Sequence, residues 1–231
     1  MLYKLSKFQL YILQSDSALK MLHSLSTNSI NEISEDALIY SALADSKARL
    51  IADFYCFLRG DDVAVIVHET KAQELCNYLN KYKVFYNFNI THDAKAIIRY
   101  RTSAKDHLAG SSEIVLADPR SKHIGSFIVS YEDLPSDRGQ IDYEDYLVEN
   151  IIIPDSFLLV GKSIIKYNLP ALNCISYHKG CYPGQEVVMG KRTYSSNYEQ
   201  SMKLVDSSKA KGIKVLAKDS SGNKSIINTY N

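Results

Sequence analysis

The chain has 231 residues, of which 27 are basic and 26 acidic, so its formal net charge is +1. This balance excludes a broad electrostatic surface for nucleic acid or an anionic membrane, although a small local patch remains open. The hydrophobic fraction of 45% suffices for one large core or two small ones. No apolar run approaches the roughly 18 residues of a membrane helix, and the first residues lack the apolar core of a signal peptide. We therefore expect a cytoplasmic protein without a membrane partner.

The first third of the chain predicts a helix, three strands and a second helix. Apolar residues recur at helical spacing over 15–25 and again over 70–82. Between them, three runs rich in β-branched and aromatic residues, at 37–44, 49–58 and 62–69, predict a three-stranded meander.

Two further strands are expected at 84–91 and 95–101. Strands, a helix and strands again over about 36–104 predict an antiparallel sheet with a helix on one face, which is typical of a ferredoxin-like α+β unit. The polar stretch 104–112 predicts a boundary.

The second half begins with predicted strands at 113–120 and 124–130. Asp142 is expected to cap a short acidic helix at 143–150 whose charges form a solvated face. Three short strands are also expected near the end of the sequence, at 203–205, 213–218 and 225–230. This segment is too short for a core of its own and must pack on the rest of the chain.

Three of the four cysteines, Cys56, Cys76 and Cys174, lie in apolar surroundings and are interpreted as small buried hydrophobes. No CxxC pair occurs, and the histidines lack the spacing of a zinc site, so we expect no metal. Cys181 differs because it stands in the stretch HKGCYPGQE, residues 178–186.

This stretch predicts a rigid bend that presents a thiol. Pro183 and Gly184 suit the second and third positions of a type II turn. Gly180 is expected where a Cβ would clash. Lys179 would favour the thiolate and lower the pKa of Cys181.

The octapeptide KGCYPGQE resembles the K-G-C-[YF]-x-G-Q-E signature of the YgfZ-like, folate-binding family, relatives of the glycine-cleavage T-protein, an aminomethyltransferase. Weaker similarity runs over about residues 8–195, including ALADSKARLIADF and ADPRSKHIG.

The resemblance implies a T-protein-like α+β fold whose lobes surround a folate-sized central cavity, with the cysteine loop at its edge. Residues 1–192 would form this folate-binding-type domain, with the ferredoxin-like lobe at about 36–104, and residues 193–231 a truncated remnant of the C-terminal β-barrel.

The resemblance also implies a role in assembling or repairing iron–sulfur clusters in client proteins, with an indirect effect on tRNA modification. Tetrahydrofolate would be the cofactor. Cys181 and Lys179 would carry the chemistry; a ligand or partner would contact the remaining motif residues, Gly180, Tyr182, Gly184, Gln185 and Glu186, together with Arg192.

Several positions depart from the family pattern. Lys166 stands where relatives carry the glutamate of a P-x-E motif, and a lysine, which only donates hydrogen bonds, cannot accept from a pterin ring. Ala48 replaces a glycine. After Q-E-V-V, either Gly190 stands where the family has an arginine, or the arginine is shifted to Arg192.

Two alternatives stay open. One is a folate-dependent aminomethyltransferase like the T-protein. The other is a non-catalytic relative that binds a protein or RNA, for which His178, Lys179, Lys191 and Arg192 form a small basic cluster. Four charges in fifteen residues more often form a solvated rim, which argues against nucleic acid.

Overall fold

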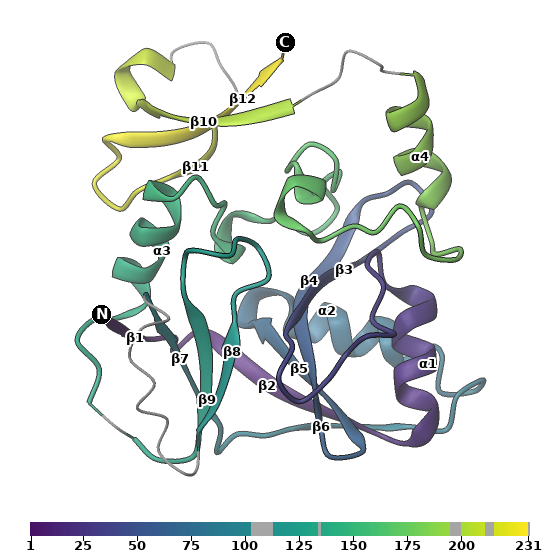
Figure 1. The fold of residues 1–231 in the computed structure, drawn as a ribbon. Helices are drawn as coiled ribbons and strands as arrows, with labels where there is room; N and C mark the ends of the chain where they lie inside the picture. Colours follow the sequence, from purple (N-terminus) through teal and green to yellow (C-terminus); the bar gives the residue numbers. More distant parts are fainter. Residues whose placement is uncertain (103–112, 134, 195–199, 211–214, 231) are drawn as a thin grey trace.

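The computed structural model describes residues 1–102, 113–133, 135–194, 200–210 and 215–230 (Figure 1). Its strands are β1 (Leu2–Lys4), β2 (Phe8–Gln14), β3 (Ile39–Ala44), β4 (Leu50–Arg59), β5 (Asp62–His68), β6 (Asn89–His92), β7 (Ile97–Arg101), β8 (Ile114–Ala117), β9 (Ser126–Ser130), β10 (Gln200–Asp206), β11 (Val215–Lys218) and β12 (Lys224–Tyr230). Its α-helices are α1 (Asp16–Leu25), α2 (Glu69–Asn80), α3 (Gln140–Glu149) and α4 (Gln185–Tyr194). The boundary expected at 104–112 lies outside the described residues.

The largest sheet has the strand order β3-β4-β5-β2-β6, with every pair antiparallel. Its β3, β4 and β5 confirm the predicted meander. Strand β2 was not predicted, although Phe8, Leu10 and Ile12 alternate along it and are all buried. Of the strand expected at 84–91, only the end is correct, because β6 begins at Asn89.

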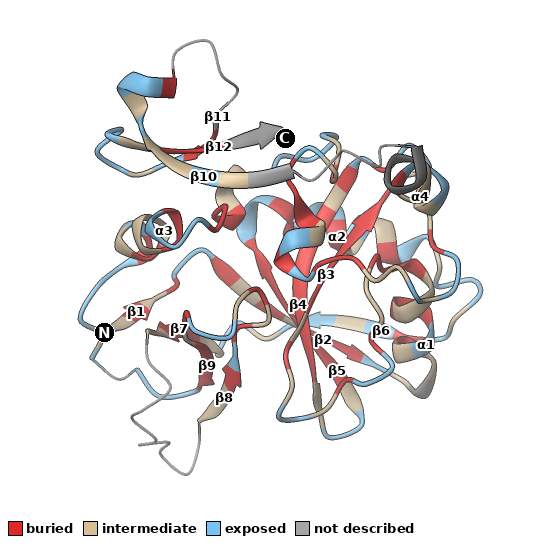
Figure 2. Ribbon diagram, turned by 45° about the horizontal axis from the view of Figure 1, so that its top comes forward, coloured by how far each residue is buried: buried red, intermediate tan, exposed pale blue. Residues whose placement is uncertain are grey.

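Alternate residues of this sheet enter two different cores, and β4 and β5 are buried along most of their length (Figure 2). On β4, Phe54 and Cys56 pack with the apolar faces of α1 and α2. Tyr55 and Phe57 point the other way, toward the second sheet and α3. Period-two alternation therefore places both cores on one sheet, as strand geometry requires.

Helix α1 confirms the first predicted helix. Ser15 Oγ accepts a hydrogen bond from Ser17 N at 3.1 Å, which caps the first turn. Met21 and Leu22 are fully buried against the sheet. The helix ends at Leu25, just before the loop that leads into β3.

The second sheet has the order β1-β7-β9-β8. Strand β7 pairs with β1 and β9 here and not with the meander, so the sheet changes between β6 and β7. A third sheet, β10-β12-β11, confirms the three strands expected near the end of the sequence (Figure 1).

Helix α3 begins three residues earlier than predicted, and Asp142 is not its cap. The N-cap is Gly139, whose N–H donates to Asp142 Oδ2 at 3.2 Å from within the first turn. The expected solvated face also has contacts: Asp145 accepts from Ser220 N at 2.6 Å, and Glu149 pairs with Lys224 at 2.8 Å. These acids hold the third sheet against α3.

Within the described residues, no helix has both the length and the apolar character needed to span a membrane.

Candidate functional site

Residues 178–186, the cysteine loop, form the turn that the sequence predicts. Gln185 N donates to Tyr182 O at 3.2 Å, which closes a four-residue turn. Gly184 has φ +84°, the left-handed value that the third position of a type II turn requires. The turn therefore ends where α4 begins, at Gln185; this helix was not predicted.

Gly184 is needed for space as well as for its dihedral angle. A Cβ at this position would lie 2.5 Å from Asp45 O and 2.9 Å from Ala48 N, in the turn between β3 and β4. Two turns thus touch backbone to backbone. Gly180 differs, because a Cβ there would meet nothing within 4 Å, so the clash expected at Gly180 is not found.

Cys181 is exposed, as the sequence predicts, whereas Cys56 and Cys174 are buried and Cys76 is half-buried. The next residue, Tyr182, is only 6% exposed and packs into the main core. The loop therefore anchors one side chain in the core and leaves the neighbouring thiol in solvent.

Lys179 contacts the end of α1. Its Nζ donates to the carbonyl oxygen of His23 at 2.5 Å and to that of Ser26, and it lies 5.2 Å from the ring centroid of Tyr182. A cation there complements the negative end of the helix dipole. Burial lowers the pKa of Lys179 to about 8. The structure gives Lys179 this anchoring contact, and its effect on Cys181 stays a prediction.

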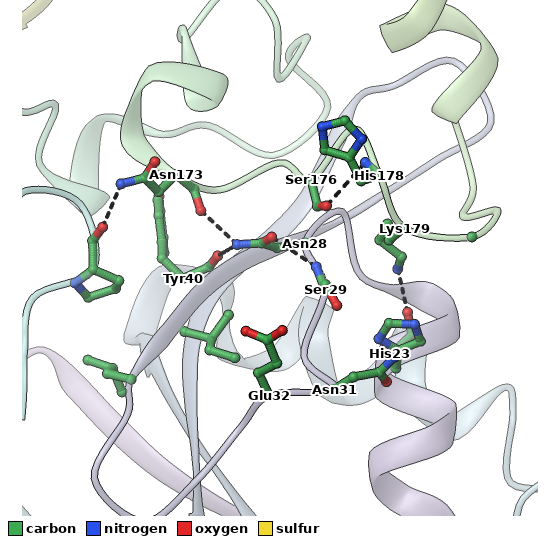
Figure 3. Close-up of a pocket in the computed structure, with 14 residues that line it drawn as sticks. His23, Asn28, Ser29, Asn31, Glu32, Tyr40, Asn173, Ser176, His178 and Lys179 are labelled. Atoms are coloured by element: carbon green, nitrogen blue, oxygen red, sulfur yellow. Dashed lines mark hydrogen bonds between the residues drawn. The ribbon is translucent and has the colours of Figure 1, made fainter.

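A cavity of about 600 Å³, the loop cavity, borders the cysteine loop (Figure 3). Its walls come from the segment after α1, from the start of β3 and from residues 173–180. Glu32, His23 and His178 contribute ionisable side chains to it. Burial and then the Lys179 ammonium lower the pKa of His23, so its imidazole is neutral at pH 7.

Asn28 joins the three walls of the loop cavity. Its Nδ2 donates to Tyr40 O at 3.0 Å and to Asn173 O at 2.7 Å, and its Oδ1 accepts from Ser29 N at 2.8 Å (Figure 3). Only tertiary contacts reveal its role, because Asn28 and Asn173 are distant in the sequence.

The remaining predicted site residues are placed as follows. Gln185 Nε2 donates to Lys179 O at 3.5 Å, so it closes the loop on itself. Glu186 is exposed in the first turn of α4. Arg192 lies further along α4, and its side chain is outside the described part of the structure.

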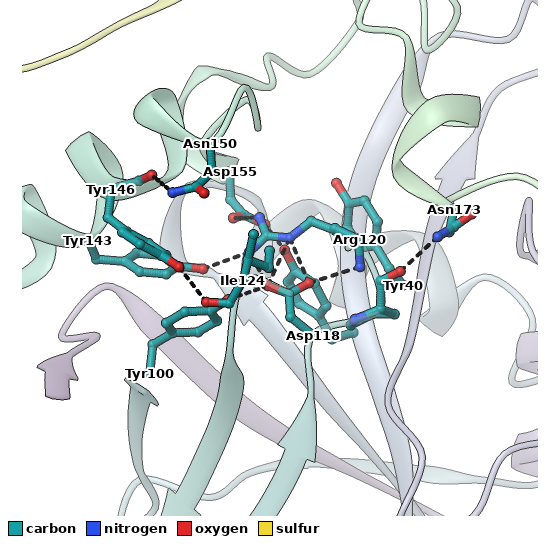
Figure 4. Close-up of polar contacts among 12 residues, drawn as sticks. Tyr40, Tyr100, Asp118, Arg120, Ile124, Tyr143, Tyr146, Asn150, Asp155 and Asn173 are labelled. Atoms are coloured by element: carbon teal, nitrogen blue, oxygen red, sulfur yellow. Dashed lines mark hydrogen bonds and ion pairs between the residues drawn. The ribbon is translucent and has the colours of Figure 1, made fainter. Parts of the chain in front are cut away.

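Away from the loop, five buried charged residues form what we name the central ion network: Asp53, Lys71, Asp118, Arg120 and Asp155. Figure 4 shows the part of it around Arg120, Asp118 and Asp155. Arg120 Nη2 donates to Asp118 at 2.7 Å and Nη1 to Asp155 at 3.3 Å. Lys71 pairs with Asp53 and donates to Asp155 O at 2.7 Å. Each described charge therefore has an opposite charge beside it.

Four tyrosine hydroxyls complete this network, and they belong to Tyr40, Tyr55, Tyr100 and Tyr143. All four residues are at most 1% exposed. Burial raises the pKa of Tyr40, Tyr55 and Tyr143 well above its ordinary value. These side chains fill the interior where the two larger sheets meet, and Tyr40 also lines the loop cavity.

Asp53 belongs to this interior. It lies on β4, an internal strand with β3 and β5 on either side. Burial raises the pKa of Asp53, opposed by Lys71.

Tetrahydrofolate, which the family resemblance implies, needs an acceptor for the N–H groups of its pterin ring. Lys166, at the position of the family glutamate, lines a second cavity of about 640 Å³ together with Arg49 and Lys162. Among the described residues that line it, none carries a carboxylate. This donor set does not fit a pterin ring.

The described residues contain no group of three or more His, Cys, Asp or Glu side chains that could hold a metal ion.

Comparison with family models finds no match to the chain. Curated relatives are similar over most of it. The tRNA-modifying protein YgfZ of Yersinia enterocolitica (serotype O:8 / biotype 1B) is 26% identical over 224 residues, which cover 85% of this chain and 68% of the relative. The protein of the same name from Yersinia pseudotuberculosis (serotype O:1b) is also 26% identical, over 227 residues, with the same coverage.

A solved structure shares the fold. The glycine cleavage system aminomethyltransferase T from Bartonella henselae matches with a TM-score of 0.62 at 12% identity, covering 96% of this chain and 71% of that one. This likeness confirms the predicted T-protein-like α+β fold with antiparallel sheets; the division into domains at residue 192 stays a prediction. Together with the octapeptide, the two sets of likenesses support a YgfZ-like family, related to the glycine-cleavage aminomethyltransferase, as the family of this chain.

Proposed function

We propose that this chain takes part in the assembly or repair of iron–sulfur clusters in other proteins, and through these clients affects tRNA modification. The observation that carries the proposal is the exposed thiol of Cys181 on a loop fixed at both sides. The similarity to proteins named tRNA-modifying protein YgfZ supports the link to tRNA.

The thiolate is the chemically competent form in this proposal, because it is a soft ligand for iron and a nucleophile toward sulfur species. Cys181 is exposed, so an iron ion or a sulfur species can reach its sulfur atom. Iron–sulfur clusters are held mainly by several cysteine thiolates. Since the described residues offer no group of three metal-ligating side chains, Cys181 would supply one ligand and the client the others, which suits brief contact during transfer.

The loop anchors make this contact reproducible. Tyr182 is buried, Gly184 touches the β3–β4 turn and Lys179 binds the end of α1. A thiol held in one place loses little conformational entropy when it binds, which favours association.

Complementation of a deletion strain tests the proposal. We expect Cys181→Ser to leave iron–sulfur enzyme activities and iron–sulfur-dependent tRNA modifications at the level of the deletion, whereas Cys76→Ser, at the half-buried thiol of α2, restores both. Equal recovery with Cys181→Ser would reject the role of the thiol. Protein levels measured by immunoblot separate loss of function from loss of the chain.

Thiol labelling of the purified protein tests the same feature directly. In the native protein, iodoacetamide should modify Cys181 well before the other three cysteines, because only Cys181 is exposed. In denaturant, all four should react at similar rates.

The aminomethyltransferase alternative receives no support from the cavity that Lys166 lines. Aminomethyl transfer from a lipoylated carrier protein to tetrahydrofolate is therefore expected to be absent. Measurable transfer would reverse the ranking of the two functions.

The structure describes only part of the basic cluster predicted near the loop. The ammonium of Lys179 binds carbonyl oxygens of α1, and the side chains of Lys191 and Arg192 lie outside the described residues. Binding of tRNA that weakens steeply with added salt would support a nucleic-acid surface here.

A further inference from the structure

The second cavity, which we name the cationic cavity, lies apart from the cysteine loop. It is bounded by residues 156–167, by Arg49 at the start of β4 and by Val215 and Leu216 of β11. Its volume of about 640 Å³ falls within the roughly 300–1,000 Å³ typical of small-molecule sites. It shares no lining residue with the loop cavity.

Among the described residues, three cations line the cationic cavity: Arg49, Lys162 and Lys166. Arg49 Nε also lies 3.4 Å from Asp45, whose carboxylate is not among the lining groups. Like charges in one cavity repel each other, so an anion that enters is favoured by all three.

One wall of the cationic cavity is aromatic and apolar. Phe157 and Tyr167 contribute rings, and Leu159 contributes an exposed alkyl group. The Tyr167 hydroxyl accepts a hydrogen bond from Leu159 N at 3.2 Å, which fixes the position of the ring. Aromatic walls favour a planar ring in the ligand, by stacking or edge contact.

Backbone hydrogen bonds join two of the segments that carry these cations. Leu50 N donates to Lys162 O at 2.8 Å, and Gly161 N donates to Leu50 O at 2.7 Å. Arg49 and Ser163 form an antiparallel bridge. This preformed backbone lowers the ordering cost of binding.

One lining residue has an unused polar group. Ser156 Oγ is buried and has no hydrogen-bond partner among the described residues. A buried hydroxyl without a hydrogen-bond partner destabilises the folded protein. A polar ligand atom within hydrogen-bond distance would remove this cost.

We propose that the cationic cavity binds a small aromatic anion, a planar ring that carries a phosphate or carboxylate group. The anionic group faces Arg49, Lys162 and Lys166, and the ring lies against Phe157 and Tyr167. Lys166 contributes one of the three cations, at a position where the family resemblance predicts an acceptor. The proposal is independent of the role of Cys181.

Isothermal calorimetry on the full chain tests the proposal with two probes. Adenosine 5′-monophosphate carries a ring and a phosphate, and 4-aminobenzoylglutamate carries a ring and two carboxylates but no pterin. We expect at least one of them to bind with a Kd below about 1 mM, and the stronger probe identifies the anionic group. Uncharged adenosine should bind at least about tenfold more weakly than the monophosphate.

Charge reversal locates the site. Lys162→Glu and Lys166→Glu should each weaken binding by about tenfold or more, whereas Lys95→Glu, at an exposed lysine of the β6–β7 turn, should not change it. Cys181→Ser should bind as the unaltered chain does. Circular dichroism confirms that each variant is folded.

Two results would overturn the proposal. One is the absence of binding by both anionic probes at millimolar concentration. The other is affinity that survives both charge reversals, or that adenosine matches, because the cations would then contribute nothing.

Discussion

The central ion network and the cysteine loop use polar groups in opposite ways. In the network, charged side chains are buried and neutralise one another, as Arg120 does between Asp118 and Asp155. In the loop, Lys179 donates hydrogen bonds to backbone carbonyl oxygens, and Cys181 stays exposed. The first arrangement stabilises an interior, and the second presents a single reactive atom.

This difference cautions against a common inference. Strongly shifted pKa values often mark functional sites, but structural ion pairs shift them as well. Here Tyr40, Tyr55 and Tyr143 have their pKa raised because they are sealed in the interior with paired charges. In this chain, exposure and a fixed turn distinguish the candidate thiol better than electrostatics does.

Removing the cation from the central network should have the largest effect. Arg120→Met leaves Asp118 and Asp155 buried without their partner, which should lower the free energy of unfolding by about 3–5 kcal/mol. Arg138→Met, which breaks an exposed pair with Asp142, should cost about 1 kcal/mol or less. Urea denaturation measures both, and similar losses would mean that the network does not hold the interior.

The next largest effect should come from the turn. Gly184→Ala forces a Cβ against Asp45 O and a positive φ on alanine, at a cost of about 2 kcal/mol or more. Gly180→Ala, in open space with no positive φ, should change stability by less than about 0.5 kcal/mol. Unfolding curves and the rate of Cys181 alkylation check both, and equal behaviour of the two variants would contradict the turn contact.

Lys179→Met should lower the free energy of unfolding by about 1 kcal/mol at pH 7, since it removes the hydrogen bonds to the carbonyl oxygens of His23 and Ser26. The effect should depend on pH. Lys179 loses its proton at about pH 8 when folded and near its ordinary pKa of 10.5 when unfolded. The unfolded chain therefore binds more protons between these values, so the contribution of Lys179 to stability is lowest below pH 8 and rises with pH across the interval.

Denaturation of the unaltered chain and of Lys179→Met from pH 7 to pH 10.5 measures this trend. Lys20→Met, at an exposed lysine on the same helix, serves as the control and should show no such trend. A difference between the unaltered chain and Lys179→Met that stays constant with pH would contradict a buried ammonium at this position.

The smallest effect is expected at Ala48, a fully buried alanine with φ +54°. Glycine relieves the strain of that dihedral angle but adds flexibility to the unfolded chain. Ala48→Gly should therefore raise the free energy of unfolding by up to about 1 kcal/mol. Ala42→Gly, on β3 where φ is not positive, should lose about 1 kcal/mol. Thermal denaturation distinguishes the two signs.

Local patterns predicted what depends on neighbours in the sequence. The meander follows from runs of β-branched residues, and the turn at Gly184 follows from Pro-Gly chemistry, because both are decided within a few residues. Helix α4 was missed because Val187, Val188 and Gly190 have low helix propensity, and tertiary contacts override it.

The contacts of the site were harder to predict. Lys179 lies two residues from Cys181 in the sequence, which suggested an effect on the thiol, yet its ammonium binds carbonyl groups more than 150 residues away. Asn28 and Asn173 meet for the same reason: the fold brings distant segments together. Such contacts depend on the packing of whole elements, and a single sequence contains no local signal for them.

The contact of Gly184 with the β3–β4 turn also constrains any molecule that binds at the sulfur of Cys181. The β3–β4 hairpin of the largest sheet holds the turn at Gly184 in place, so this turn has little freedom to move toward a binding partner. A binding partner must therefore carry its reacting atom on a flexible or extended segment. The conformational entropy lost on binding is then lost mainly by that segment of the partner.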